Sequence, residues 1–111
     1  MKRKTRPAAR PRATRISPRA LAARVVEDVV VHSRYLDAAL AEIPERVPAR
    51  DGALIQEMSY GTLRWFDQLV AVAALFLDKP LKQKDQDVYA LLLVGLYQLL
   101  FMRVARHAAV Q

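Results

Sequence analysis

The chain has 111 residues, 53% of them hydrophobic and 26% charged, with 18 Lys or Arg, 11 Asp or Glu and no cysteine. This length allows one domain, and the balance of apolar and charged residues is typical of a globular protein. The absence of cysteine excludes disulfides, thiolate metal sites and cysteine nucleophiles, and fits a reducing cytoplasmic location. With 2 histidines and no clustered carboxylates, we expect no metal site.

The positive charge is concentrated at the N-terminus. Residues 1–19 carry eight Lys or Arg and no acid, so the remaining 92 residues have ten basic and 11 acidic groups, a net charge of −1. A basic arm on a near-neutral domain predicts a polyanionic partner, and nucleic acid is favoured over a membrane. The alternative is a solubilising tail without a partner. On the RNA hypothesis, the phosphate contacts are Lys2, Arg3, Lys4, Arg6, Arg10, Arg12, Arg15 and Arg19.

The same arm has features to compare with two kinds of targeting signal. A secretory signal needs an apolar segment, and residues 1–19 have none. A mitochondrial presequence is also Arg-rich and poor in acids, but Pro7, Pro11 and Pro18 oppose the amphipathic helix that it forms. We therefore predict residues 1–17 to be a disordered basic tail and residues 18–111 to be the folded domain.

The first helix is predicted from Ser17-Pro18 to about Ser33, with Ser17 as N-cap and Pro18 at the first helical position. A short helix over about residues 35–43 follows. The third covers about residues 49–65, and the fourth residues 66–77, which Pro80 follows. The apolar faces expected for the first and third helices are Ala22, Val25, Val26 and Val29, with Leu21 at the margin, and Leu54, Met58, Gly61 and Trp65.

The fifth helix, over residues 88–104, is the most apolar part of the chain. Its uncharged run from Val88 to Met102 has 15 residues, whereas a membrane span needs about 20. It is therefore predicted to be the buried central helix of a bundle, in which Gly95 would let a neighbouring helix approach closely. The aromatic residues at helical spacing are expected in the core rather than stacked on bases: Tyr60, Trp65, Phe66, Tyr97 and Phe101.

Residues 106–111 have the pattern of the first turn of a sixth helix. A domain that ends there is expected to be truncated. Arg103, Arg106 and His107 cluster near the end of the fifth helix, where cations stabilise the helix dipole, so a structural role is expected for them. Arg24, Arg50 and Arg64 are individually expected to be solvated or ion-paired.

Three stretches together resemble a known family. They are Arg50 to Arg64, which contains Tyr-Gly-Thr-Leu-Arg; Lys79-Pro80-Leu81 with Lys84; and Leu93 to Phe101, which contains Gly-Leu-Tyr-Gln-Leu-Leu, followed by Arg103 and by residues 107–110. In this order they resemble the N-terminal NusB-like domain of bacterial 16S rRNA (cytosine-C5)-methyltransferases, the RsmB/Sun/Fmu family. The resemblance covers residues 17–111. Ala105 and Arg106 depart from it where the family has a proline.

The resemblance implies an all-α fold, a NusB-like bundle of five to six helices, which helps such an enzyme dock on ribosomal RNA. In that family the domain precedes a methyltransferase domain that binds S-adenosylmethionine and uses two cysteines. This chain has no cysteine and no glycine-rich cofactor loop after a strand, so the family's catalytic residues have no counterpart here. We expect no catalysis by this chain alone and no cofactor in it.

Stand-alone NusB-type antitermination factors share the fold implied by the resemblance. These factors begin with an Arg-rich first helix that contacts RNA. Residues 19–24 are similar to that helix, which adds Arg24 to the predicted RNA contacts. The expected partners are therefore RNA, 16S rRNA in particular, and a methyltransferase domain in the same polypeptide. The alternatives are a stand-alone factor of this kind or a helical protein-interaction module.

Overall fold

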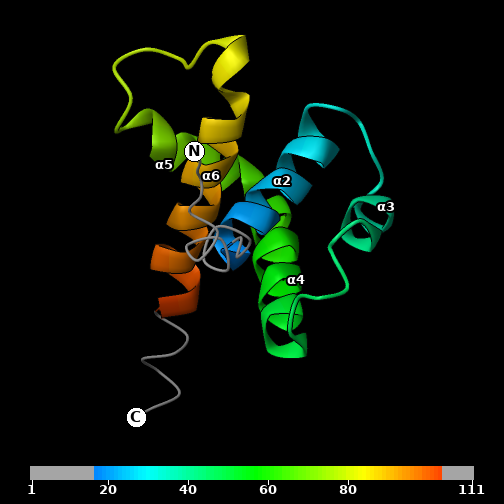
Figure 1. Ribbon diagram of the computed structural model, residues 1–111. Coiled ribbons are helices and arrows are strands. Elements are labelled where there is room, and N and C mark those ends of the chain that lie inside the picture. Colours follow the sequence, from blue (N-terminus) through cyan, green and yellow to red (C-terminus); the bar gives the residue numbers. More distant parts are fainter. Residues whose placement is uncertain (1–16, 104–111) are drawn as a thin grey trace, which may run out of the picture.

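The computed structural model describes residues 17–103, and every regular element within that range is helical (Figure 1). The α-helices are α2 (Pro18–Val30), α3 (Leu36–Ala41), α4 (Ala49–Arg64), α5 (Phe66–Ala74) and α6 (Gln86–Tyr97). A 3₁₀ turn, η2 (Gln83–Asp85), leads into α6, and a π-helical segment, η3 (Gln98–Met102), continues it. The predicted all-α bundle is confirmed, whereas residues 1–16 and 104–111, including the predicted sixth helix, lie outside the described residues.

The start of α2 follows directly from its sequence. The Ser17 hydroxyl accepts a hydrogen bond from the Ala20 backbone N–H at 3.0 Å, and Pro18 occupies the first turn. The helix ends at Val30, earlier than the predicted Ser33. Ser33 instead has a left-handed backbone with φ of 56°, and it turns the chain toward α3.

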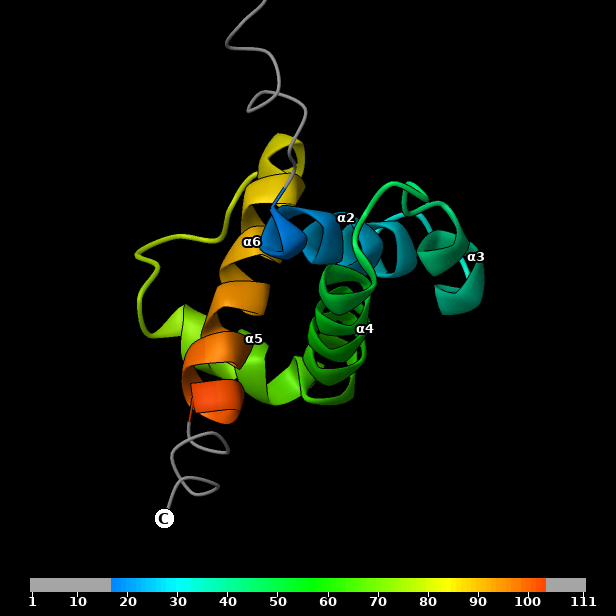
Figure 2. The same ribbon diagram turned by 60° about the horizontal axis from the view of Figure 1, so that its bottom comes forward.

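One core cluster lies where α2 packs against both α4 and α6, and Figure 2 shows α2 spanning these two helices. The side chains of Val26, Ile55 and Met58 are almost completely buried there. Leu21, expected at the margin of α2, also belongs to this cluster. The buried face of α4 is therefore rotated from the predicted one. Leu54, which was predicted to lie on this face, is only partly buried, and Ile55 lies in the cluster instead.

A second cluster joins α5 to α6. Its aromatic part is a stack in which the Phe101 ring lies 5.0 Å from Trp65 and 5.4 Å from Tyr97, measured between ring centroids. The prediction that these rings contribute to the core is confirmed. The same prediction for Tyr60 is wrong: its side chain is 50% exposed on the outer face of α4.

The close approach between helices occurs at a different glycine from the predicted one. Apart from its chain neighbours and the backbone of its own helix, Gly95 has no atom within 4 Å of the position where a Cβ would lie, so no neighbouring helix approaches it among the described residues. At Gly61, by contrast, a Cβ would overlap the Tyr97 ring, which shows that α4 and α6 pack most tightly there. The crossing of two helices, rather than the apolar run around Gly95, decides which glycine is needed.

Two other helices end earlier than the sequence pattern predicts. The helices α3 and α5 end at Ala41 and Ala74, and Leu75 and Phe76 lie in the following turn, exposed by 82% and 70%. The helix α6 contacts α2, α4 and α5, as predicted for a central helix. The prediction that the apolar run is buried is only partly right, because Val88 and Leu91 of α6 and Leu99 and Leu100 of η3 are exposed. Within residues 17–103 no helix is long and apolar enough to span a membrane.

Candidate nucleic-acid interface

Of the predicted RNA contacts, the structure describes Arg19 and Arg24. Lys2, Arg3, Lys4, Arg6, Arg10, Arg12 and Arg15 lie outside the described residues, as do Arg106 and His107. Arg19 and Arg24 are both exposed on α2, but they line different hollows. The structure therefore does not bring these two arginines together on one site.

Arg19 is positioned by a residue from the other end of the described chain. Its Nε donates a hydrogen bond to Oε1 of Gln98, 79 residues later, at 2.5 Å. This bond is possible because the first turn of α2 packs beside the end of α6. The guanidinium is thus held in place before any ligand arrives, which lowers the entropic cost of a contact made by a long side chain.

Arg19 and Gln98 belong to a hollow of about 810 Å³ between the start of α2, α4 and the end of α6. We call it the Arg19–Arg103 hollow, and its lining residues are Arg19, Glu57, Gly95, Gln98, Leu99, Met102 and Arg103. The π-helical segment η3 supplies three of them. Sequence reasoning assigned Arg103 to the helix dipole and missed this grouping. The available signal was the four-residue spacing of Gly95, Leu99 and Arg103, which places them on one helix face.

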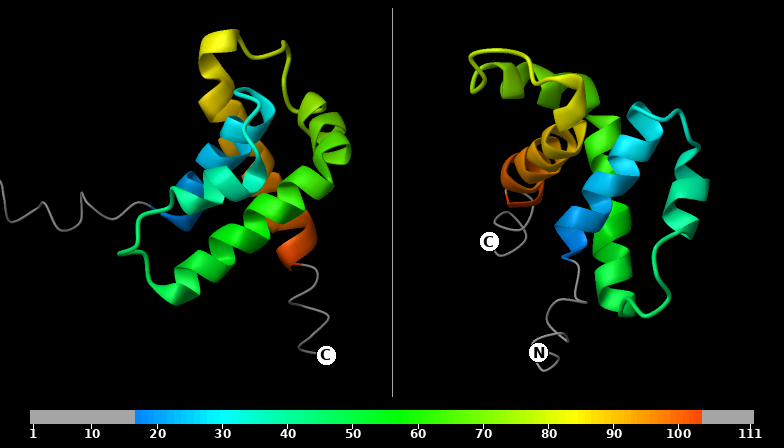
Figure 3. Two further views of the ribbon diagram at one scale, coloured as in Figure 1. Left: turned by 90° about the vertical axis from the view of Figure 1, so that its right-hand side faces the viewer. Right: turned by 45° about the horizontal axis from the view of Figure 1, so that its top comes forward.

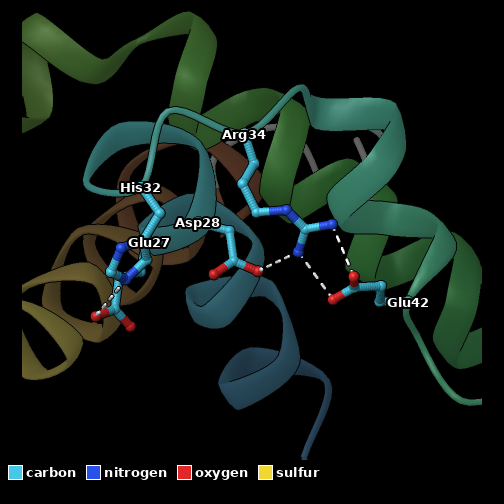
Figure 4. Close-up of polar contacts among 5 residues, drawn as sticks. All are labelled: Glu27, Asp28, His32, Arg34 and Glu42. Atoms are coloured by element: carbon cyan, nitrogen blue, oxygen red, sulfur yellow. Dashed lines mark hydrogen bonds and ion pairs between the residues drawn. The ribbon is translucent and has the colours of Figure 1, made fainter.

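A second polar cluster, which sequence reasoning also missed, connects α2 to α3 (Figure 4). Arg34 donates from Nη1 and Nη2 to the two Glu42 carboxylate oxygens, at 2.8 and 2.7 Å, and from Nη1 to Asp28 at 3.3 Å. The hydrogen bonds and charge of Arg34 lower the pKa of the Glu42 carboxyl, and those of Glu42 raise the pKa of Arg34. Beside it, His32 lies 3.9 Å from Glu27.

This Arg34 cluster fixes a short helix rather than forming a reactive site. The α3 helix lies on the side of α2 away from α6 and packs mainly against α2 (Figure 3). The shallow hollow between the two helices holds Arg24 together with the Arg34, Asp28 and Glu42 groups. Because its two carboxylates already pair with Arg34, the positive charge available to an anion there is small.

The NusB family model matches residues 16–111. This chain belongs to the NusB family. It is 47% identical over 92 residues to the ribosomal RNA small subunit methyltransferase B of Vibrio vulnificus, a match that covers 83% of this chain and 22% of that protein. It is 43% identical over 95 residues to the protein of the same name from Pseudomonas syringae pv. tomato, covering 86% and 21%. No solved structure matches the chain.

This NusB-family domain spans about a fifth of the length of the methyltransferases that it matches. The predicted relationship to the N-terminal region of those enzymes is therefore confirmed. Within residues 17–103 no group of three or more His, Cys, Asp or Glu side chains is placed to hold a metal ion.

The charges of the chain are unevenly distributed between its two parts. Residues 17–103 contain ten basic and 11 acidic groups, a net charge of −1, whereas residues 1–16 contain seven basic groups and no acid. Arg64 lies 5.9 Å from the Trp65 ring, and Arg50 is exposed. The positive excess of the chain therefore adjoins the domain at Ser17, two residues before Arg19.

Proposed function

We propose that this NusB-family domain binds 16S rRNA through its basic N-terminal segment, residues 2–19, and docks an S-adenosylmethionine-dependent cytosine-C5 methyltransferase on that RNA. The observation that supports this proposal is the separation of charge, with seven basic groups and no acid in residues 1–16, against a folded part of net charge −1. Its relatives are named ribosomal RNA methyltransferases, which favours ribosomal RNA as the polyanion that this segment binds. We propose a cytoplasmic location, where that RNA is found.

The domain is a docking part in this proposal and transfers no methyl group itself. S-adenosylmethionine would be bound by the methyltransferase domain, not by the residues described here. We expect the purified chain to incorporate no methyl group into rRNA from labelled S-adenosylmethionine. Incorporation at a rate above a protein-free blank would contradict this part of the proposal.

The RNA-binding part is tested by the salt dependence of affinity. Each phosphate contact to a single strand contributes about −0.7 to the slope of log K against log salt concentration, so the seven basic groups of residues 1–16 alone give a slope of about −5. The affinity of the chain for a fluorescein-labelled 16S rRNA fragment should then fall roughly a thousandfold between about 50 and 200 mM salt. Fluorescence anisotropy would measure it.

The control keeps the length of the segment and removes its charge. In this variant glutamine replaces each of Lys2, Arg3, Lys4, Arg6, Arg10, Arg12 and Arg15. We expect its slope to fall to about −1 or less in magnitude. A slope that does not change between the two proteins would show that the segment takes no part in binding.

Docking can be separated from affinity in a chimera in which this chain replaces the matched region of the Vibrio vulnificus enzyme. The glutamine variant of the segment should raise the KM for 16S rRNA and leave kcat nearly unchanged, because the segment does not touch the reacting atoms. An equal loss of kcat and kcat/KM would place the segment in the chemical step and contradict a docking role.

A further inference from the structure

We propose that the Arg19–Arg103 hollow binds one nucleotide of single-stranded RNA, with its phosphate at Arg19 and Arg103 and its base over the floor at Gly95 and Leu99. The proposal rests on the proposed RNA-binding function and extends it from the basic segment to the folded part. It also gives Arg103 a ligand-binding role, which the sequence pattern did not predict.

Two arginines supply the positive charge of the hollow. They come from α2 and from the end of the α6–η3 helix, 84 residues apart in sequence, and both line the hollow. Within residues 17–103 no carboxylate lies within ion-pair distance of either guanidinium, so both retain donors for a phosphate. Gln98 holds Arg19 by its Nε, which leaves the two terminal nitrogens of that guanidinium for the ligand.

The remainder of the hollow suits a base. Gly95 has open space at the position of a Cβ, and Leu99 is 52% exposed, so a flat ring can approach the helix backbone over apolar surface. The carboxylate of Glu57, which lines the hollow from α4, repels a phosphate, but it can accept a hydrogen bond from an exocyclic amino group of a base. The volume of about 810 Å³ lies within the range of small-ligand pockets.

The backbone at this site departs from the ordinary helix. Gln98, Leu99 and Met102 belong to η3, whose π-helical geometry sets their positions along the hollow. Such π segments within α-helices are rare and occur frequently at functional sites.

The position of the hollow favours RNA over a helix of a protein partner as its occupant. The basic residues 2–15 join the folded part at Ser17, two residues before Arg19. A strand whose phosphates contact that segment is therefore kept at high effective concentration beside the hollow. A helix docked on the same face would instead bring its apolar side against two arginines and Glu57.

The test uses two glutamate substitutions that change the net charge equally. Gly95→Glu introduces a negative side chain into the hollow, and Gly52→Glu introduces the same side chain at a helical glycine of α4 that also has open space. We expect Gly95→Glu to weaken binding of a fluorescein-labelled single-stranded oligo(C) by roughly tenfold or more at low salt. Gly52→Glu should weaken it by less than about threefold.

Arg103→Gln is the second variant, with Arg46→Gln in the α3–α4 loop as its control, because both arginines are exposed. The Arg103 variant should lower the magnitude of the salt slope by about 0.7, while the Arg46 variant leaves it unchanged. In the unsubstituted chain, photocrosslinking to oligonucleotides that contain 4-thiouridine should label the peptide of residues 95–103. Far-UV circular dichroism would verify that each variant is folded.

The outcomes are distinguishable from failure of the proposed function. If the chain binds RNA with a steep salt slope, but the two variants equal their controls and crosslinks are confined to residues 1–16, the hollow is not an RNA site and the basic segment acts alone. If the chain binds no RNA, both proposals fail. If Gly95→Glu leaves RNA binding unchanged, and analytical ultracentrifugation shows that the unsubstituted chain self-associates whereas this variant does not, the hollow is a protein interface and the proposal is overturned.

Discussion

The packing of α4 on α6 can be tested by one methyl group at Gly61. An alanine Cβ at this position would overlap the Tyr97 ring. The ring cannot simply turn away, because Tyr97 is only 9% exposed and its other side stacks on Phe101. Gly61→Ala therefore forces either a rotation of Tyr97 out of its stack or a separation of the two helices.

The expected cost follows from two opposing effects. Alanine is about 1 kcal/mol more favourable than glycine in a helix interior, which stabilises the variant. Overpacking a tight core costs about 1 to 3 kcal/mol, and loss of an aromatic pair costs a further 0.5 to 1.5 kcal/mol, approximately. The net destabilisation of Gly61→Ala should therefore lie between about 0.5 and 3.5 kcal/mol. At the middle of this range, about 2 kcal/mol, the Tm of a domain of this size falls by roughly 8 to 16 °C.

Urea unfolding followed by far-UV circular dichroism would measure this free energy, with Gly52→Ala as the matched control. Gly52 lies in the same helix and has open space at its Cβ position, so its alanine variant should be stabilised by up to about 1 kcal/mol. In the double variant Gly61→Ala/Tyr97→Leu a smaller side chain replaces the opposing ring. It should recover part of the stability that Gly61→Ala loses, which gives a favourable coupling energy between the two positions. If Gly61→Ala were as stable as Gly52→Ala, the close helix contact would be refuted.

Four further predictions concern single groups. Ser17→Ala removes the N-cap of α2 and should destabilise the domain by about 1 kcal/mol in urea unfolding, unlike Ser17→Asp, which retains a capping oxygen. Thr62→Val removes a buried hydroxyl that has no hydrogen-bond partner among the described residues, so it should stabilise the domain by up to about 1 kcal/mol, and a loss would show that the hydroxyl is bonded. Arg34→Ala should speed amide hydrogen exchange in α3 more than in α4. Since Arg34 lowers the pKa of Glu42, the wild-type protein should show the same change as the pH falls below the ordinary carboxyl value of 4.5. Equal exchange in both helices would contradict this expectation. Burial raises the pKa of Tyr97 above its ordinary value of 10.0, so its neutral form stabilises the fold below that pH, and this contribution is lost as the pH rises further. Tyr97→Phe should therefore flatten the fall in Tm that is measured between about pH 9 and 11. An unchanged profile would assign the fall to other groups.

The helices could be predicted because their signals are local. Ser17-Pro18 specifies a helix start through one side-chain oxygen and one fixed φ angle, and the structure has that cap. Proline at position 48 similarly precedes the first turn of α4. Errors of a few residues occurred at helix ends, as at Ser33, where a left-handed turn stops α2 although apolar residues continue to Val31.

Side-chain surroundings were less predictable because they depend on which helices cross, and where. Tyr60 and Tyr97 both lie at helical spacing in apolar runs, yet Tyr60 is half exposed and Tyr97 is buried. Gly95 and Gly61 differ for the same reason. The Arg34 pairing with Glu42 crosses a turn between two helices, so no helical spacing of charges indicates it.

The candidate interface combines one feature that the sequence predicted with one that only the fold produces. The segregation of basic residues into the N-terminal segment is visible in the sequence, and contacts from such charges to phosphates give affinity without reading the bases. The joining of Arg19 to Gln98 and Arg103 requires the packing of α2 on α6. A guanidinium beside an apolar floor can contact both the phosphate and the base of one nucleotide, whereas phosphate contacts alone do not reach the base. On the two proposals, the segment therefore supplies most of the binding free energy, and the hollow determines which part of the RNA is placed beside the enzyme.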